Sequence, residues 1–126
     1  MEQVTRVATT LEASCLRDNL LPALEQLKGV VPKRADRLPI TMGVKIEAKY
    51  DRLWLTTTDL TTALTVWVGA QVEAEGAAVV DFRRFYEGVK GLSKLGRIDL
   101  QRDGYNLNLV SGPVRLQFQV NDPDNY

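Results

Sequence analysis

The sequence predicts an α+β domain in which two helices pack on antiparallel β-sheets. Residues 38–72 read as three strands joined by two tight turns, with one apolar face that needs a cover. Two segments with apolar residues at helical spacing flank this stretch, one before it and one after it. The order of a strand, a helix and three strands therefore occurs twice, in residues 4–72 and 77–120. Two such β-α-β-β-β units should place both helices on one side of the sheets.

Length and composition favour one domain, residues 1–126, which is large enough to bury a core without metals or disulfides. The single cysteine, Cys15, has no partner for an internal disulfide. No run has the length of a membrane helix or the layout of a signal peptide, so we expect a cytoplasmic protein without membrane contacts. The formal charge is zero, from 16 basic and 16 acidic residues, which argues against a generic polyanion binder but allows a localised basic surface.

The first unit begins with a weakly alternating stretch at residues 4–11, which predicts a strand. Ser14 is a candidate N-cap for a helix that runs to about Val30. Pro22 interrupts this pattern, so it marks either a kink or a later start of the helix. The apolar stripe of the helix consists of Leu16, Leu20, Ala23, Leu24 and Leu27.

The three strands within residues 38–72 show the period of two that half-buried strands have. Polar breaks at residues 50–52 and 59–60 separate them. We interpret Trp54 and Trp67 as packing residues, because large aromatic side chains mostly serve cores and interfaces. The apolar residues that alternate along the first and third strands are Ile40, Met42, Val44, Ile46, Ala48, Leu64, Val66 and Val68.

The second unit follows a predicted turn at residues 73–76 and begins with a short strand at residues 77–80. Asp81 can cap a helix that runs from Phe82 to about Leu92. At helical spacing the apolar side consists of Phe82, Phe85, Tyr86, Val89 and Leu92. The opposite side consists of Arg83, Glu87, Lys90 and Lys94. Three strands follow at residues 97–101, 105–110 and 114–120, joined by turns at Asp103-Gly104 and at residues 111–113.

The sequence predicts no catalytic residue, no metal site and no cofactor. Asp51, Asp59, Asp81 and Asp103 each lie where a turn or a helix cap favours a carboxylate, and they form no evident pair. Cys15 has no histidine to activate it, because the chain contains none. The glycines match no phosphate-binding loop. We therefore expect a protein that is not an enzyme.

Five segments carry a resemblance to a known family. They are Leu38-Pro39-Ile40 followed by Val44-Lys45-Ile46, the run from Thr56 to Leu60, the run from Val80 to Phe85, Ser111-Gly112, and the helix segment from Asn19 to Leu24 with its proline. In this order and spacing the chain resembles the DNA sliding clamps, and within them the N-terminal domain of the bacterial DNA polymerase III beta subunit. The resemblance extends from about Thr10 to Pro123.

The resemblance implies a processivity factor for DNA replication. Clamps of this family are closed rings of six similar domains, with helices lining a central hole and sheets forming the outer rim. They encircle double-stranded DNA without reading its sequence and tether polymerases to it. The implied partners are duplex DNA, a homo-oligomer or other clamp domains, and a DNA polymerase or clamp loader. The bacterial clamp has three such domains per chain, so this chain is either a free-standing relative or a piece of a longer clamp.

The basic side of the second helix is a candidate surface for DNA. Arg83, Lys90 and Lys94 form either a solvated helix face or a stripe that faces phosphates without reading bases. The resemblance adds the loop before residue 38, where a basic residue of the family touches DNA, so Arg34 and Arg37 are both candidates. Acidic residues interrupt this picture: Glu87 lies within the stripe, and Asp18 and Glu25 lie on the first helix.

The last strand is the candidate subunit interface. Leu116 and Phe118 alternate with polar residues there, and they either pack in the core or lie at an edge that pairs with a neighbouring protomer, as the resemblance implies. The resemblance also places Arg84 and Arg115 at ion pairs across that seam. A second hypothesis uses the same edge differently: the chain is a protein-binding module that caps or modulates a full-length clamp and has no direct DNA role.

Overall fold

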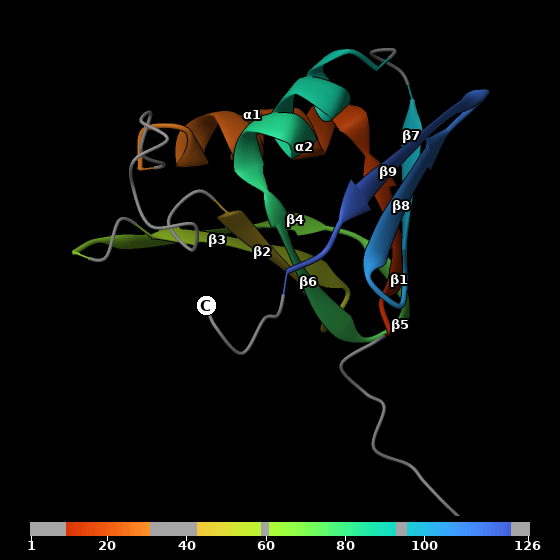
Figure 1. Cartoon of the computed structure of the whole chain (residues 1–126), viewed down its shortest axis with the longest axis horizontal. Coiled ribbons are helices and arrows are strands. Elements are labelled where there is room, and N and C mark those ends of the chain that lie inside the picture. Colours follow the sequence, from red (N-terminus) through yellow and green to blue (C-terminus); the bar gives the residue numbers. More distant parts are fainter. Residues whose placement is uncertain (1–9, 31–42, 59–60, 93–95, 122–126) are drawn as a thin grey trace, which may run out of the picture.

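The computed structural model describes residues 10–30, 43–58, 61–92 and 96–121, and it shows two antiparallel sheets with two helices on one side (Figure 1). The elements are β1 (Glu12–Leu16), α1 (Arg17–Leu27), β2 (Gly43–Lys49), β3 (Arg52–Thr58), β4 (Ala63–Gly69), β5 (Gln71–Ala74), β6 (Gly76–Asp81), α2 (Phe82–Lys90), β7 (Arg97–Asp103), β8 (Asn106–Ser111) and β9 (Val114–Gln119). The predicted α+β class is confirmed. Within the described residues no helix has the length and apolar character needed to cross a membrane.

The two sheets are connected because the end of each β-α-β-β-β unit pairs with a strand of the other sheet. One sheet has the order β5-β1-β7-β8-β9 and the other has the order β4-β3-β2-β6. After β4 the chain bends at Ala70, whose N–H still donates to the Asp51 carbonyl at 3.1 Å, and β5 then pairs with β1 in the other sheet. The end of β9 does the same, because the Asn121 N–H donates to the Val79 carbonyl of β6 at 2.7 Å. The predicted repeat of element order is thus a repeat of topology.

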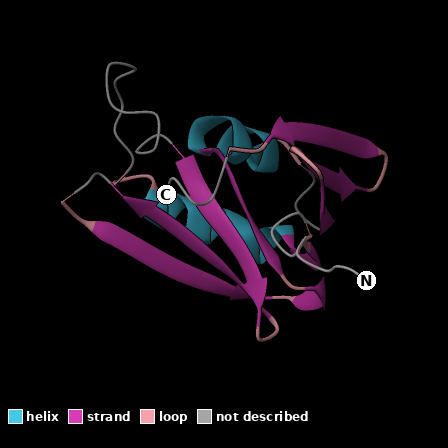
Figure 2. Cartoon of the chain, turned by 60° about the horizontal axis from the view of Figure 1, so that its bottom comes forward, coloured by secondary structure: helices cyan, strands magenta, loops and turns pink. Residues whose placement is uncertain are grey.

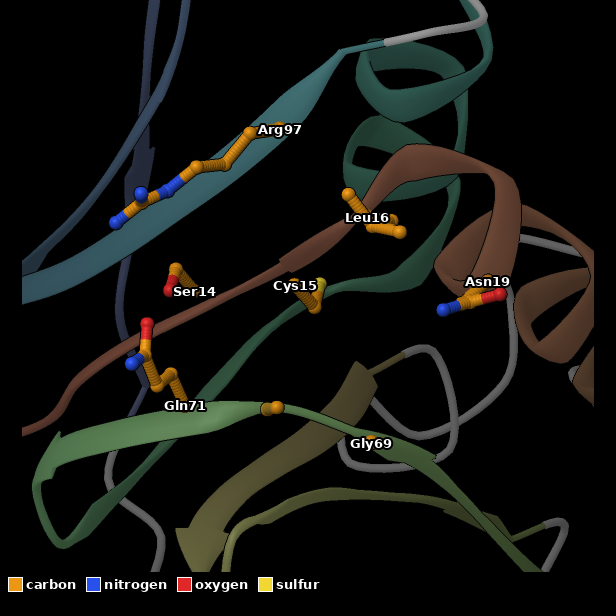
Figure 3. Close-up of a pocket in the computed structure, with 8 residues that line it drawn as sticks. Ser14, Cys15, Leu16, Asn19, Gly69, Gln71 and Arg97 are labelled. Carbon is orange, nitrogen blue, oxygen red and sulfur yellow. The ribbon is translucent and has the colours of Figure 1, made fainter.

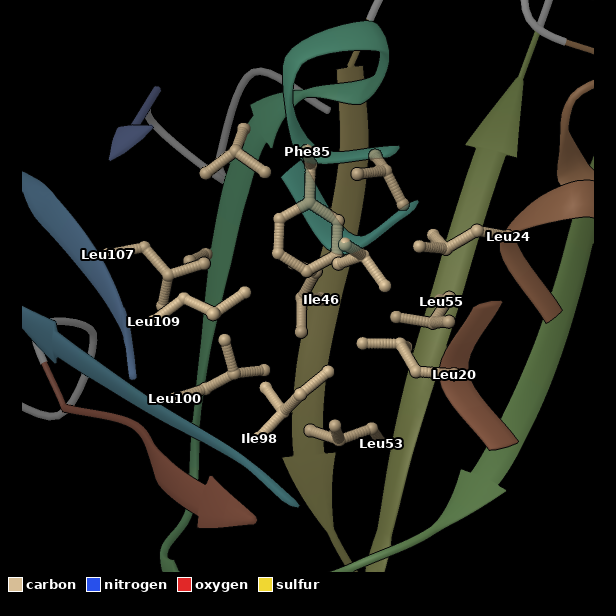
Figure 4. Packing of buried hydrophobic residues seen from close by; sticks show 14 of the residues in the cluster. Leu20, Leu24, Ile46, Leu53, Leu55, Phe85, Ile98, Leu100, Leu107 and Leu109 are labelled. Atoms are coloured by element: carbon tan, nitrogen blue, oxygen red, sulfur yellow. The ribbon is translucent and has the colours of Figure 1, made fainter. Parts of the chain in front are cut away.

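The core lies between the helices and the inner faces of both sheets. Six of the side chains predicted to face inward are buried: Leu20, Leu24, Leu27, Phe82, Phe85 and Val89. Leu16, which the sequence placed on the same stripe as the leucines, instead lies in β1 and is 54% exposed. Figure 4 shows Phe85 of α2 between residues of the two sheets, such as Leu107 on one side and Ile46 on the other. This arrangement explains why apolar residues recur at helical spacing in α1 and α2 and at every second position in the strands.

The first strand and the start of α1 differ from the sequence prediction. The first described strand is Glu12–Leu16. Of the predicted residues 4–11, only 10 and 11 are described and neither is in a strand, and the rest of that prediction lies outside the described residues. Ser14 lies inside this strand and is not an N-cap; Leu16 occupies the cap position and makes no side-chain cap bond. The reason is tertiary: β1 is paired on both edges, with β5 and with β7, and this pairing outweighs the local preference of serine for a cap.

Three smaller predictions also need correction. α1 ends at Leu27 rather than near Val30. Pro22 lies inside α1, which begins at Arg17, so the alternative of a helix that starts later is wrong. The predicted turn at residues 73–76 contracts to Glu75, because β5 runs to Ala74 and β6 begins at Gly76. Gly76 is required there, since a Cβ atom would collide with the Thr10 carbonyl oxygen. By contrast, α2 begins at Phe82 as predicted and is capped by Asp81, whose Oδ2 accepts from the Arg84 N–H at 2.9 Å.

Trp67 does not pack in the core, because the residue is 51% exposed. It lies on the face of the β4-β3-β2-β6 sheet that points away from the helices. Figure 2 shows that face towards the reader, with both helices behind it. The half-buried Trp54 is its direct neighbour across the β3–β4 pair.

Candidate nucleic-acid interface and subunit edge

The outward side of α2 presents two of the predicted DNA-binding cations. Arg83 and Lys90 are both exposed, and the exposed Glu87 lies between them on the same stripe. Lys90 lies in the last turn of α2, where a cation interacts favourably with the helix dipole. The other three predicted residues, Arg34, Arg37 and Lys94, lie outside the described residues. The structure therefore brings together two of the five.

A buried tyrosine between the two helices brings a further cation to this surface. The Lys28 Nζ lies 4.9 Å from the centroid of the Tyr86 ring, and the Lys90 Nζ lies 5.7 Å from it. Its hydroxyl donates to Glu25 Oε2 at 3.3 Å. Lys28 is not among the DNA-binding residues that the sequence predicts. The available signal was its position directly after the apolar stripe of α1, where a basic residue favours a helix C-terminus.

Arg17 links the beginning of α1 to the end of α2 by a hydrogen bond. Its Nη2 donates to the Lys90 carbonyl at 3.0 Å, and its backbone N–H donates to the Gly96 carbonyl at 3.0 Å. Its Nη1 also lies 3.5 Å from the Asp18 carboxylate. Both acidic residues of α1 that interrupt the predicted basic surface are thus engaged locally, Asp18 by Arg17 and Glu25 by Tyr86. Lys28, Arg83 and Lys90 remain exposed cations on the surface of the helix pair.

Strand β9 forms one outer edge of its sheet, and the register shows which of its backbone groups are open. A two-residue turn joins Ser111 to Val114, with Gly112 at a φ of 57°. Hydrogen-bonded and non-hydrogen-bonded residue pairs alternate along an antiparallel ladder, beginning with the hydrogen-bonded pair Ser111 and Val114. The Val120 N–H donates to the Tyr105 carbonyl at 2.8 Å, which agrees with this alternation. The residues between, Arg115, Gln117 and Gln119, consequently direct their N–H and C=O groups away from β8.

The side chains of Leu116 and Phe118 point inward onto α2. The rings of Phe118 and Phe85 meet edge to face with centroids 5.3 Å apart. At Gly88 an added Cβ would lie 2.9 Å from Leu116 Cδ1 and 3.1 Å from Phe118 Cζ, so glycine gives these side chains their space. Both are half-buried. The core-packing alternative therefore describes most of their contacts, and the open edge consists chiefly of backbone.

Arg84 and Arg115 lie on either side of this contact. Arg84 is one turn before Gly88, so it projects from the side of α2 that faces β9. Arg115 is on the opposite face of β9 from Leu116, because side chains alternate along a strand. Both arginines are exposed, and neither forms an ion pair with a described residue. The four predicted interface residues thus gather around one strand.

A hollow of about 350 Å³ lies where β1 meets α1, and it contains the only cysteine of the chain. Figure 3 shows its lining residues, which are Ser14, Cys15, Leu16, Asn19, Gly69, Ala70, Gln71 and Arg97. Burial raises the pKa of the Cys15 thiol to about 12, and the Asp99 carboxylate contributes. Asp99 itself accepts from Arg97 Nε at 3.0 Å. A thiol held in its protonated form is a poor nucleophile.

Comparison with known proteins agrees with this geometry. The model of the family "DNA polymerase III beta subunit, N-terminal domain" matches residues 11–126. The beta sliding clamp of Caulobacter crescentus superimposes with a TM-score of 0.89 at 25% identity, over 94% of this chain and 32% of that one. The DnaN sliding clamp of Bartonella birtlesii gives 0.88 at 26% identity, over 93% and 31%.

A third clamp, the DNA polymerase III subunit beta of Pseudomonas aeruginosa, gives a TM-score of 0.85 at 25% identity, over 91% and 31% of the two chains. The comparison with curated proteins found no match. The chain spans about a third of the length of the clamps that it matches. With its two interlocked β-α-β-β-β units and its match from residue 11 to residue 126, the chain belongs to the family of the DNA polymerase III beta subunit N-terminal domain.

Proposed function

We propose that the chain is a sliding-clamp domain that turns its helices towards duplex DNA and contributes to a ring around it. The observation that carries this proposal is the helix pair itself. Lys28, Arg83 and Lys90 remain exposed or outward on it, while Arg17 and Tyr86 engage the two acidic residues of α1. Arg34, Arg37 and Lys94 would extend the same basic surface. The function is that of a processivity factor in the cytoplasm, without catalysis.

Phosphate contacts of this kind suit a protein that moves along DNA. Lysine and arginine neutralise phosphates wherever the strand lies, so the contact carries no sequence information. Glu87 within the stripe keeps the attraction weak, which favours sliding over tight binding. Retention on DNA must then come from topology, because a closed ring can leave only at a DNA end or by opening.

The ring requires neighbours, and β9 is the edge we assign to them. The backbone groups of Arg115, Gln117 and Gln119 can pair with a strand of another clamp domain. Arg84 and Arg115 would meet acidic side chains there and set the register. Leu116 and Phe118 support the strand from behind by packing on α2. A DNA polymerase or a clamp loader would bind the assembled ring rather than this domain alone.

Salt-dependent binding to closed circular and linear duplexes tests the DNA contact. We expect Arg83→Glu with Lys90→Glu to weaken binding to all sequences alike and to lower the slope of log affinity against log salt by about two. The matched control is Lys45→Glu with Lys49→Glu, which makes the same charge change on the sheet face away from the helices. An equal loss in both double variants, or an unchanged slope in the first, would contradict the proposal.

The open edge of β9 also favours a second candidate, a module that caps a full-length clamp without touching DNA. Gln117→Pro separates the two, because it removes an outward N–H and leaves the bonds to β8 in place. For a ring component, this variant should lose both self- or cross-association by light scattering and retention on circular DNA. For a capping module, it should lose binding to a full-length clamp, while the Arg83 and Lys90 double variant should bind that clamp normally.

A further inference from the structure

The β5-β1-β7-β8-β9 sheet has a hollow of about 200 Å³ on the face that points away from the helices. Along β1 and β7 the inward side chains belong to the core, whereas the outward ones are mostly polar or charged. A ligand in this outer hollow would therefore be recognised by charge and hydrogen bonds rather than by apolar contact. The lining includes Glu12, Ser14, Glu73, Arg97, Asp99 and Arg115.

Ser14 lies at the floor of the outer hollow, and its hydroxyl has no partner there. The residue is only 8% exposed, and the hydroxyl makes no hydrogen bond with any residue that the structure describes. Figure 3 shows it on the same side of β1 as the side chains of Gln71 and Arg97. Polar groups that are buried to this extent are nearly always hydrogen-bonded. The Ser14 oxygen is thus an acceptor that the fold leaves for a ligand.

Two carboxylates meet at one end of the outer hollow because of a β-bulge. The register between β1 and β5 shifts between Glu12 and Ala13, which makes Glu73 an extra residue on β5. A bulge redirects a side chain, and here both Glu12 and Glu73 line the hollow. Neither forms an ion pair with a described residue. Like charges on neighbouring strands repel each other, so a cation between these two carboxylates would be stabilised.

The outer hollow becomes basic towards β7 and β9. Arg97 and Arg115 line it on that side. The third carboxylate of the lining, Asp99, is already engaged, because it accepts from Arg97 Nε at 3.0 Å. Arg115 is on β9, three strands from β1, which separates the two backbones by about 14 Å. The acidic end therefore attracts one cation, and the basic end repels a second one.

The type of cation follows from the oxygens at the acidic end. Within the described residues, no three carboxylate, thiol or imidazole groups converge closely enough to hold a metal ion. Two carboxylates and one hydroxyl oxygen instead form a set of three acceptors. A primary ammonium has three N–H donors and no acceptor, so each donor can meet one of these oxygens.

We propose that Glu12, Glu73 and Ser14 bind the primary ammonium group of a linear amine that carries no second positive charge. The carboxylates accept two charge-assisted hydrogen bonds, and the Ser14 oxygen accepts the third. The stem of the amine extends over the sheet towards β7 and β9, where a neutral or anionic end is compatible with the arginines. A free amine and a lysine side chain share this group. The site lies on the face away from the helices, so it does not depend on the proposed DNA contact.

Three amines with the same four-carbon stem test the assignment. Butylamine, 4-aminobutanoate and 1,4-diaminobutane end in a methyl group, a carboxylate and a second ammonium, and the backbone amide shifts of β1 and β5 in NMR spectra report binding. We expect saturable binding of butylamine with a Kd of about 1 mM. 4-Aminobutanoate should bind at least as tightly, and 1,4-diaminobutane at least about threefold more weakly. Tetramethylammonium has the charge without N–H donors and should bind at least about tenfold more weakly than butylamine.

Matched variants distinguish this site from a general attraction of amines to carboxylates. Glu12→Gln, Glu73→Gln and Ser14→Ala should each weaken butylamine binding about tenfold, and circular dichroism confirms that each variant is folded. The control is Glu75→Gln, which makes the same charge change at an exposed residue between β5 and β6 that does not line the outer hollow. This variant should keep the affinity of the unaltered chain.

N-acetyl-lysine amide identifies the source of the ammonium, because it presents the same stem from a peptide backbone. Tighter binding than butylamine assigns the site to a lysine side chain, and weaker binding assigns it to a free amine; both results support the ammonium site. Three results would overturn the proposal. They are no saturable shift with butylamine at about 10 mM, equal binding of butylamine and tetramethylammonium, and equal losses in Glu73→Gln and Glu75→Gln. A preference for 1,4-diaminobutane would contradict the single positive charge of the ligand.

Discussion

The two strand–helix junctions, β1–α1 and β6–α2, occupy equivalent places in the fold and differ where the fold leaves them free. Leu16 and Asp81 are the respective N-caps. Counted from these caps, the inward residues correspond and are buried in both units: Leu20 with Phe85, Leu24 with Val89, and Leu27 with Leu92, which follows the end of α2. The outward residues have opposite charge: Asp18 corresponds to Arg83, and Glu25 to Lys90. Packing thus constrains one side of each helix, and the other side of α2 has become basic.

The junctions also differ in what holds the helix. α2 has local signals, with the Asp81 carboxylate accepting from the Arg84 N–H and Gly91 at the C-cap. α1 has no side-chain cap and contains Pro22, which cannot donate to the Asp18 carbonyl. α1 is held instead by its buried leucines and by the Arg17 contact with the end of α2. The comparison predicts that α1 depends more on tertiary packing than α2 does.

The largest effect is expected from removing a buried leucine of α1. Leu24 is fully buried, so Leu24→Ala should lower the free energy of unfolding by about 3–5 kcal/mol through lost burial and a cavity. Urea unfolding followed by circular dichroism measures it. The matched variant in α2 is Val89→Ala, which removes a smaller side chain and should cost less. A larger loss at Val89 would contradict the ranking of the two helices.

Replacing Pro22 should have the next largest effect, in the stabilising direction. Pro22→Ala restores an N–H donor for the Asp18 carbonyl and removes the steric conflict of the ring within α1. We expect a gain of about 2 kcal/mol, below the full cost of an interior proline because alanine also loosens the unfolded chain. Thermal and urea unfolding measure it. Glu87→Pro, at the equivalent position of α2, should lower the free energy of unfolding. If neither variant changes the free energy of unfolding, proline has no cost at this position and the prediction is contradicted.

These differences explain which parts of the structure the sequence could predict. α2, its Asp81 cap and the Asp103-Gly104 turn follow from local patterns, and Gly104 does have a positive φ of 61°. The start of α1 could not be predicted in this way, because Ser14 pairs with Asp99 and Gln71, which are far away in the sequence. Local preference cannot show that a segment will be paired on both edges.

The candidate site divides in the same manner. Arg83 and Lys90 follow from helical spacing alone, and the structure places both on the outward side of α2. Lys28 and the engagement of Glu25 depend on Tyr86, which reaches across from the other helix. The inward direction of Leu116 and Phe118 depends on Gly88 in α2. Contacts between distant segments are thus what the sequence pattern could not provide.

The thiol at the first junction should make stability depend on high pH. The raised pKa of Cys15 means that the folded protein keeps the proton while the unfolded thiol ionises near 9.0. The contribution is fully present below pH 9 and is lost as the pH rises towards 12, so the loss at pH 10 is about 1.4 kcal/mol. The control is Cys15→Val, since Val80 occupies the equivalent place in β6. The difference in unfolding free energy between the two proteins should change from pH 7 to pH 10, and a constant difference would contradict the assignment.

The smallest expected effect is the transfer of a cap from the second junction to the first. Leu16 has an extended backbone with φ −95° and ψ 139°, close to the −62° and 125° of Asp81, and the residue is 54% exposed. In Leu16→Asp the carboxylate can therefore accept from the N–H groups of the first turn of α1, and it meets the positive end of the helix dipole. Asp18 lies in the same turn and partly opposes the added charge. We expect a gain of about 0.5 kcal/mol, measured by urea unfolding.

Asp81→Ala should show the opposite effect, a loss of about 1 kcal/mol. If Leu16→Asp lowers stability while Asp81→Ala behaves as expected, the Leu16 side chain makes a stabilising contact that aspartate cannot replace. The two cap positions would then not be equivalent.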